Sequence, residues 1–253
     1  MYTATLHTHT HTLSLSLSDS LSRHSSPHNT YKTPSALAAQ TLLTPSHSRS
    51  YSVTKAPKAK LPYIRHGDNM VADSHFIMQY LVNTFGEGKT HLGQLRIKLT
   101  PEERARSVLL ERICADDLYC VLLYSRWVME EGWKKMVHVF FSRLPNFLLP
   151  IIPAMVRRSI ANWMHGHGFS RHSYGDIVSM IDEQLEAISI LLGDQTYFNG
   201  SEPTIADPPV FAMLDAIMGV DVDPLGLQDI VHKYANLERF RQHVRRTVYD
   251  LEE

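Results

Sequence analysis

The sequence predicts a mainly α-helical protein with a short strand-containing unit in front of its helices. Three observations carry this prediction. Residues 61–81 follow the pattern strand, turn, strand and helix, two segments after residue 100 repeat apolar side chains at helical spacing, and residues 1–54 show almost no apolar periodicity. We therefore expect a disordered leader over residues 1–54, a β-β-α unit over residues 55–95 and an all-helical domain over residues 96–253.

The leader is rich in Ser, Thr, His and Leu. Its alternating His-Thr and Leu-Ser runs, residues 8–12 and 13–18, are what CA and CT nucleotide repeats encode, so our hypothesis is that it is translated repeat or untranslated sequence. Disorder is expected because few apolar side chains are present to offset the entropy of ordering. A transit peptide is a second interpretation, since residues 21–60 carry six Lys and Arg side chains and no Asp or Glu.

Composition limits the function classes. The net charge of −1 provides no electrostatic reason to expect nucleic acid as a partner. Cys114 and Cys120 lie six residues apart in a helical pattern, and we expect them to be reduced thiols in or near the core of an intracellular protein. No metal is expected, because the 15 histidines lack the companion ligands of a zinc site.

One apolar stretch, residues 137–156, has roughly the length that spans a bilayer. Arg143 and Asn146 lie in its interior, and three prolines would each free a backbone carbonyl from its hydrogen bond. We therefore do not expect an integral membrane protein. A broken helix pair packed against the core, or a surface for a partner or a membrane, is the preferred interpretation.

The β-β-α unit is predicted from local chemistry. Residues 61–65 alternate β-forming side chains, residues 66–69 have turn composition, and residues 70–72 form a second strand. A helix then begins at Asp73 and Ser74, with apolar side chains repeating over residues 76–81. Pro62 lies inside a strand without an N–H to donate, which suggests a cis peptide at a bend.

The first long helix is predicted to begin at Thr100, with Pro101 at its first position and Glu103 completing a capping box. It should continue to about Val128 and place the following side chains on or near one face: Leu109, Ile113, Cys120 and Trp127. Asp116 and Asp117 lie in the middle of this helix. We favour a solvated, salt-bridged edge for them, with a polar lining of a cleft as the alternative.

The second long helix is predicted over residues 174–192, where five apolar side chains form one stripe that ends at Gly193. A loop then leads to Thr204 and Asp207. We expect the Thr204 hydroxyl to accept from the Asp207 N–H, and the Asp207 carboxylate to accept from the Thr204 N–H, as a structural N-cap. Pro208 and Pro209 depart from this pattern because they lack N–H groups, so the alternative is that Asp207 itself caps a helix beginning at Pro208.

Four segments resemble known proteins. Residues 61–81 resemble the second half of the thioredoxin-like domain of glutathione transferases, and the run YFNGSEPTIAD, residues 197–207, resembles the loop that opens the buried helix of their C-terminal domain. The runs APKAKLPYI, residues 56–64, and GHGFSRHS, residues 166–173, are similar to the failed axon connections branch of the metaxin-like proteins. The resemblance extends from about Lys55 to the C-terminus.

The resemblance implies a glutathione site at Leu61 and Pro62, which would hold the peptide backbone, and at Asp73 and Ser74, which would hold the γ-glutamyl carboxylate. The first half of the thioredoxin-like domain, which carries the thiol-activating Ser, Tyr or Cys, has no recognisable counterpart, so no catalytic residue is assigned. We expect a non-catalytic binding or interaction role, with a glutathione-dependent transferase as the alternative. The resemblance implies a cytoplasmic protein, and is compatible with mitochondrial or plastid association.

A partial sheet also has consequences for partners. Without the first strand of the thioredoxin-like domain, residues 61–65 would present an unpaired edge, and the apolar face of the helix after Ser74 would be uncovered. Unpaired edges recruit other chains. We therefore expect self-association or a protein partner at residues 61–85.

Overall fold

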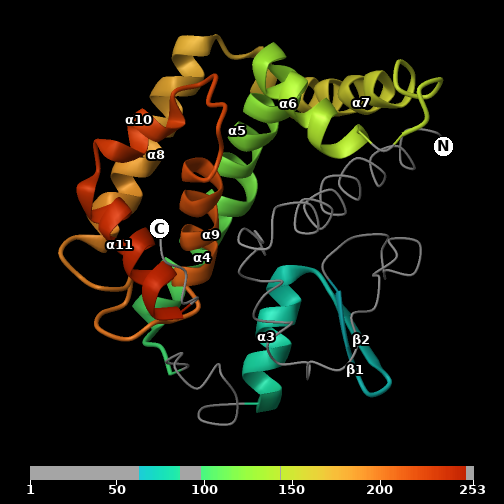
Figure 1. Cartoon of the computed structure of the whole chain (residues 1–253). Coiled ribbons are helices and arrows are strands. Elements are labelled where there is room, and N and C mark those ends of the chain that lie inside the picture. The colour runs from blue at the N-terminus through green and yellow to red at the C-terminus, as the bar shows by residue number, and fades with distance from the viewer. Residues whose placement is uncertain (1–62, 86–97, 143, 249–253) are drawn as a thin grey trace. The chain divides into compact units, whose positions relative to one another are not determined.

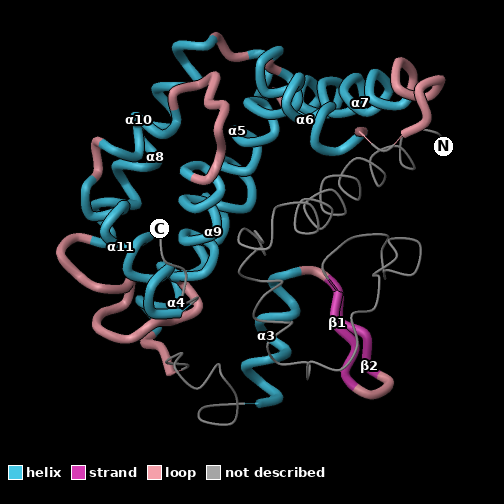
Figure 2. Tube along the Cα trace, viewed as in Figure 1, coloured by secondary structure: helices cyan, strands magenta, loops and turns pink. Residues whose placement is uncertain are grey.

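The computed structural model describes residues 63–85, 98–142 and 144–248, and it divides the chain into two compact units (Figures 1 and 2). The first unit comprises Met1–Gln94 and Val137–Ser159, and the second comprises Leu95–Met136 and Ile160–Glu253. Within these described ranges, two strands precede a series of helices, so the prediction of a mainly α fold is confirmed. The leader over residues 1–54 and the predicted site residues Leu61 and Pro62 lie outside the described residues.

The first unit contains an antiparallel hairpin of β1, Tyr63–His66, and β2, Asn69–Ala72, drawn in magenta in Figure 2. Tyr63 pairs with Ala72 and His66 with Asn69, which leaves two residues for the turn. Gly67 takes a φ of 61°, a left-handed conformation that glycine adopts without a Cβ penalty. The turn is therefore set by local sequence, as predicted.

Helix α3, Ser74–Phe85, packs against this hairpin. Ile77 and Leu81 lie one turn apart on the helix and are almost fully buried, as is Ile64 on β1. A hydrogen bond of 2.7 Å joins His66 Nδ1 and the Tyr80 hydroxyl, and adds a polar link between hairpin and helix. The predicted strand–turn–strand–helix order is confirmed over the described residues.

The rest of the first unit comes from the apolar stretch of the sequence. It contains the end of α6, Glu130–Phe141, the turns of residues 144–151 and the start of α7, Ile152–His167. The two helices are separate, as the prolines of this stretch predict. In the part of the chain that the structure describes, no helix combines the length and the apolar character needed to cross a bilayer.

The second unit begins with a long helical path from Thr100 to Val128. It consists of α4, Pro101–Arg112, α5, Tyr119–Leu123, and two π-helical segments, Ile113–Leu118 and Tyr124–Val128. Thr100 and Glu103 form both bonds of the capping box, at 3.2 and 2.8 Å, so the predicted helix start is confirmed.

The buried face of this path differs from the prediction. Leu109 is 62% exposed and the next residue, Leu110, is fully buried. Cys120 and Trp127, predicted for the same face, are buried. A π turn holds one more residue than an α turn. Each π segment therefore changes which side of the helix faces the core. One α-helical period cannot predict the buried residues both before and after such a segment.

Helix α9, Asp207–Met218, packs against other helices of the second unit. It contacts α4, the first π segment, α10, Leu227–His232, and α11, Ala235–Val248. Helix α8, Tyr174–Leu192, contacts α10 and α11 and is capped by Ser173. The predicted apolar stripe of α8 is confirmed, because its members are all fully buried: Ile177, Ile181, Leu185, Ile188 and Leu192. Gly193 ends α8 with a φ of 55°.

A close helix approach generates the first prediction. A Cβ at Gly132 in α6 would fall on the carbonyl oxygen of Ser125 in the second π segment. Replacing a helical glycine by alanine normally stabilises a protein by about 0.5–1 kcal/mol. At Gly132 the steric clash should reverse that sign, so we expect Gly132→Ala to lower the free energy of unfolding by about 1–3 kcal/mol. Urea denaturation measures the change.

The matched control is Gly166→Ala in α7, where a Cβ would meet no atom within 4 Å. This variant should be as stable as the wild type or more stable. Equal stability changes in the two variants would show that the close contact between α6 and the Ser125 carbonyl does not require glycine at position 132.

Candidate functional site

The start of α3 is the described part of the predicted glutathione site. Asp73 has a φ of 78°, and among the described residues it is the only non-glycine residue with a positive φ. Its carboxylate oxygen Oδ1 accepts from the His75 N–H at 3.0 Å, and its carbonyl accepts from the Ile77 N–H at 2.9 Å. Asp73 therefore caps the helix from an uncommon backbone conformation, the kind that clusters at ligand sites.

Ser74 supplies hydrogen-bond donors at this helix start. Its side chain is exposed, and neither its N–H nor its hydroxyl has a hydrogen-bond partner among the described residues. Helix N-termini favour anions, because first-turn N–H groups and the helix dipole point the same way. The adjacent Asp73 carboxylate favours a cation instead. The pair is therefore suited to a ligand group that carries both charges, such as the α-amino and α-carboxylate groups of an amino acid.

The two cysteines are not nucleophiles at neutral pH. Burial, with a smaller contribution from Glu111, raises the pKa of Cys114 to about 12. Burial together with the charges of Asp117 and Asp116 raises the pKa of Cys120 to about 11. Both thiols are free and buried, as the sequence predicts, and they remain protonated and unreactive at physiological pH.

Asp116 and Asp117 are exposed on the first π segment. Asp116 forms an ion pair of 3.5 Å with Arg112, one turn earlier, and both side chains are more than half exposed. Such surface pairs contribute little to stability. The observed geometry agrees with the solvated-edge interpretation.

Asp207 lies at the centre of a buried polar cluster where the structure places both predicted capping residues. Its Oδ1 accepts from the Phe198 N–H at 2.9 Å. Its Oδ2 accepts from the Thr204 N–H at 2.7 Å and from the Thr204 hydroxyl at 3.0 Å. Burial nevertheless dominates over these donors and raises the pKa of the Asp207 carboxyl above its ordinary value.

One bond of this cap differs from the expectation. The Asp207 N–H donates to the Thr204 carbonyl at 3.2 Å, and the Thr204 hydroxyl accepts from the Ala206 N–H at 3.3 Å. Helix α9 begins at Asp207, so the Thr204–Asp207 bonds close the turn ahead of the helix. Pro208 and Pro209 then occupy the first turn, where N–H groups have no intrahelical acceptor.

Hydrogen bonds between this cluster and α4 could not be predicted from the sequence. Arg106 Nη1 donates to the Phe198 carbonyl at 3.1 Å. The Asn199 amide donates to the Thr204 hydroxyl at 2.9 Å and to the Ser107 hydroxyl at 3.3 Å. These residues are about 90 positions apart in sequence, and no single-sequence signal relates them.

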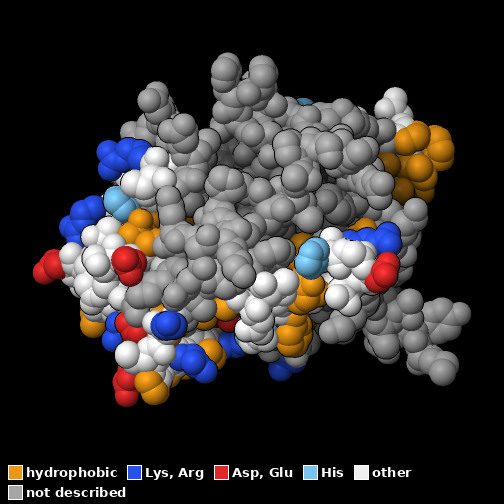
Figure 3. Space-filling model, turned by 90° about the horizontal axis from the view of Figure 1, so that it is seen from below, with side chains coloured by type: hydrophobic (Ala, Val, Ile, Leu, Met, Phe, Trp, Pro, Cys, Tyr) orange, Lys and Arg blue, Asp and Glu red, His pale blue; other side chains and the backbone are white. Residues whose placement is uncertain are grey.

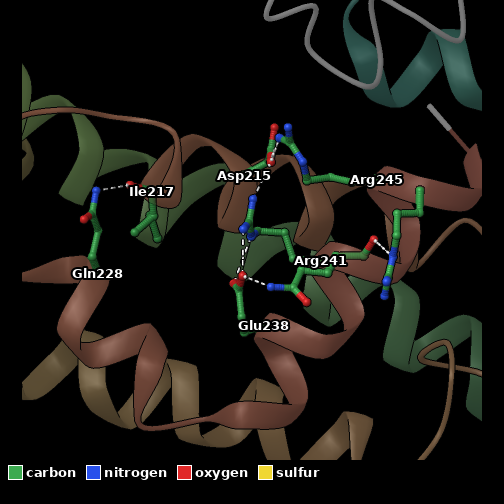
Figure 4. Close-up of polar contacts among 8 residues, drawn as sticks. Asp215, Ile217, Gln228, Glu238, Arg241 and Arg245 are labelled. Atoms are coloured by element: carbon green, nitrogen blue, oxygen red, sulfur yellow. Dashed lines mark hydrogen bonds and ion pairs between the residues drawn. The ribbon is translucent and has the colours of Figure 1, made fainter. Parts of the chain in front are cut away.

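Arginines of two other helices also hold α9. Arg126 Nη2 donates to the Ala216 carbonyl in the last turn of α9 at 2.8 Å, and burial lowers the pKa of Arg126. On α11, Arg241 and Arg245 both contact the Asp215 carboxylate, and Arg241 also binds Glu238 (Figure 4). Among the described residues, no group of His, Cys, Asp and Glu side chains could hold a metal ion.

Comparisons with known proteins agree with this fold. A family model described as the glutathione S-transferase N-terminal domain matches residues 34–132, and one described as the glutathione S-transferase C-terminal domain matches residues 181–244. This chain is a glutathione S-transferase-like protein related to metaxin-2 and Failed axon connections. The N-terminal match begins inside the segment that the sequence predicts as a leader.

Three relatives show the range of this family. The chain is 24% identical to an isoprene-epoxide–glutathione S-transferase of Rhodococcus sp. (strain AD45), over 78% of the chain and 80% of that protein. It is 24% identical to Homo sapiens metaxin-2, over 77% of the chain and 72% of that protein. Identity to Drosophila melanogaster Failed axon connections is 26%, over 64% of the chain and 40% of that protein.

The buried cap generates the second prediction. Asp207→Ala removes the acceptor for three donor groups, of which two are backbone N–H groups in a buried loop. An unsatisfied buried donor costs roughly 1–3 kcal/mol, so we expect the free energy of unfolding to fall by about 3 kcal/mol or more. Chemical denaturation provides the measurement.

Asp176→Ala is the control, because Asp176 completes the capping box of α8 at an exposed position. Its loss should be clearly smaller, since water can replace the bonds. A loss at Asp176 as large as that at Asp207 would contradict the role assigned to burial.

The third prediction concerns pH. Burial opposes the charged form of Glu238, but the hydrogen bonds and charge of Arg241 outweigh it and lower the pKa of Glu238 below its ordinary value of 4.5. A lowered pKa contributes stability above the unfolded pKa, and that contribution is lost as the pH falls through the folded pKa. The stability difference between wild type and Glu238→Gln should therefore be constant near neutral pH and shrink below about pH 4.5. A difference that grew on acidification would contradict this assignment.

Proposed function

We propose that this glutathione S-transferase-fold protein of the metaxin-like type acts by binding and not by catalysis. The observation that carries the proposal is the start of α3. There, Ser74 offers two donors without a partner among the described residues, beside the carboxylate of Asp73. Both thiols of the chain, by contrast, are buried and protonated. Two of the named relatives, metaxin-2 and Failed axon connections, do not carry a transferase in their names.

The proposed ligand is glutathione, bound through its γ-glutamyl end. The ligand carboxylate would accept hydrogen bonds from the Ser74 N–H and hydroxyl, and the ligand ammonium would lie near the Asp73 carboxylate. Hydrogen bonds to charged groups contribute more than neutral ones, so these contacts would dominate recognition. Leu61 and Pro62 would hold the peptide backbone of glutathione, as the family resemblance implies.

A glutathione-dependent transferase is the second candidate. It is favoured by the similarity to the isoprene-epoxide–glutathione S-transferase, which covers most of both chains. Such an enzyme needs a group that stabilises the glutathione thiolate. An activity measurement separates the two candidates.

The fourth prediction tests binding. Calorimetric titration of glutathione into the full chain should show binding that Ser74→Ala weakens at least about tenfold, since a hydrogen bond to a charged group is lost. Thr84→Ala, at an exposed position near the other end of α3, is the control and should bind as the wild type does. Equal affinity of wild type and Ser74→Ala, or binding by neither, would remove this site from the functional account.

The same preparations test catalysis. With glutathione and 1-chloro-2,4-dinitrobenzene or an epoxide, the conjugation rate should equal the rate without protein. Turnover above that background would overturn the non-catalytic proposal and establish the transferase alternative.

A further inference from the structure

The loop between α8 and α9 contains the one Asn-Gly pair of the sequence, Asn199–Gly200. In such a pair the backbone nitrogen of the glycine can attack the side-chain amide of the asparagine, because glycine has no Cβ to obstruct ring closure. The outcome is deamidation, which replaces the neutral amide by a carboxylate. The surrounding structure decides whether this reaction can begin.

Backbone hydrogen bonds hold the attacking nitrogen in the folded loop. The Gly200 N–H donates to the Tyr197 carbonyl at 3.1 Å, and the Tyr197 N–H donates to the Gly200 carbonyl at 3.0 Å. Phe198, inside this turn, is held at both its N–H and its carbonyl. Asn199 is only 7% exposed, so solvent has little access to the pair. The Gly200 nitrogen is therefore free to attack only after the loop opens.

The side-chain amide of Asn199 is held as well. Its Nδ2 donates to the Thr204 hydroxyl at 2.9 Å and to the Ser107 hydroxyl at 3.3 Å. Each hydroxyl has one hydrogen, and that of Thr204 is donated to Asp207 Oδ2. The Ser107 hydrogen is donated to the Glu103 carbonyl. Both hydroxyl oxygens therefore accept from residue 199, and an amide supplies these donors whereas a carboxylate cannot.

The product of deamidation does not fit this network. A carboxylate at position 199 would place acceptor oxygens against two hydroxyl oxygens, in a loop that already contains the buried carboxylate of Asp207. A buried charge without donors is costly. Carboxylates at the surface avoid this cost because water solvates them, and Asp and Glu side chains are exposed on the face shown in Figure 3.

We propose that Asn199–Gly200 is a deamidation site that the folded loop protects, and that reaction in an opened loop prevents the loop from closing again. The site thereby limits how long a chain can remain open and still return to the native fold. The residues involved all lie in the second unit, and the proposal does not depend on glutathione binding.

The reaction needs only base and water. Base removes the proton of the Gly200 nitrogen, which then bonds to Cγ of Asn199. The Cγ–Nδ2 bond breaks, and Nδ2 takes up a proton and leaves as ammonia, so that a cyclic succinimide remains. Water opens this ring at Cγ to give aspartate, or at the backbone carbonyl carbon of residue 199 to give isoaspartate. Isoaspartate also lengthens the main chain by one carbon atom, which shifts the pairing of Tyr197 with Gly200.

Peptide mass spectrometry of the full chain tests the protection. The chain is incubated at mildly alkaline pH, either folded in buffer or unfolded in guanidinium chloride, and the peptide containing Asn199 is followed over time. Deamidation should be at least about 100-fold slower in the folded sample, because the reaction requires the loop to open first. Asn162, which is exposed on α7 and followed by Trp163, is the internal control and should react little in either sample.

A variant of α4 tests whether the loop contacts provide the protection. Ser107→Ala removes one acceptor of the Asn199 amide and should raise the folded-state rate about fivefold, since one buried hydrogen bond is lost. Ser189→Ala is the matched control, because it removes a hydrogen bond between Ser189 and Asn236 that does not involve the loop. The rate at Asn199 in this control should equal that of the wild type.

The consequence is tested by introducing the product directly. Asn199→Asp should reduce the folding equilibrium constant at least about tenfold, or prevent folding, because the buried carboxylate lacks donors. Asn162→Asp, at an exposed position, should unfold in denaturant as the wild type does.

Three outcomes would overturn the proposal. They are equal deamidation rates in the folded and unfolded samples, an equal increase in the Ser107→Ala and Ser189→Ala variants, and an Asn199→Asp variant as stable as the wild type.

Discussion

The carboxylate of Asp207 is removed from water and held by the loop that precedes α9. Two backbone N–H groups and one hydroxyl donate to it, while burial raises its pKa. A charge in this position is costly unless its acceptor capacity is used. The loop must therefore keep Phe198 and Thr204 in place, and Phe198 in turn packs edge-on against Phe240 of α11. One buried group thus couples a loop, a helix start and a remote helix.

Helix α9 connects this buried cap to other segments of the second unit through hydrogen bonds and ion pairs. Its first turn follows the cap, its last turn accepts from Arg126, and Asp215 in between pairs with two arginines of α11. Ser107 and Arg106 bring α4 to the same loop. Hydrogen bonds of this kind are directional, so they specify how the helices meet, whereas the apolar stripe of α8 supplies burial without that specificity.

The proposed binding role rests on where the hydrogen-bonding groups of α3 and the two thiols lie. At the start of α3, in the first unit, the N–H and hydroxyl of Ser74 have no partner among the described residues, and the Asp73 carboxylate is exposed. The thiols lie in the second unit, where desolvation keeps them protonated. The exposed apolar side chains Phe147, Ile151 and Met155 also belong to the first unit. The residues proposed to bind glutathione therefore differ from those that stabilise the core, so substitutions can test one role without removing the other.

Local chemistry in the sequence determined the hairpin turn at Gly67, the capping boxes at Thr100 and Ser173, and the stripe of α8, because turns, caps and regular periods depend on neighbouring residues. The Asp73–Ser74 helix start was predictable for the same reason. Its positive φ was not, since a left-handed non-glycine residue is held by the surrounding fold.

Tertiary structure decided the rest. On α4, Leu110 and not Leu109 is buried, and packing against other helices, which no local pattern encodes, decides which face turns inward. The contacts from Arg106 and Ser107 to the Asp207 loop span about 90 residues, and only the folded chain brings them together. The sequence by itself determined where α3, α4 and α8 begin. The tertiary structure decided which of their faces are buried and which polar groups share a site, because both depend on contacts between residues far apart in the chain.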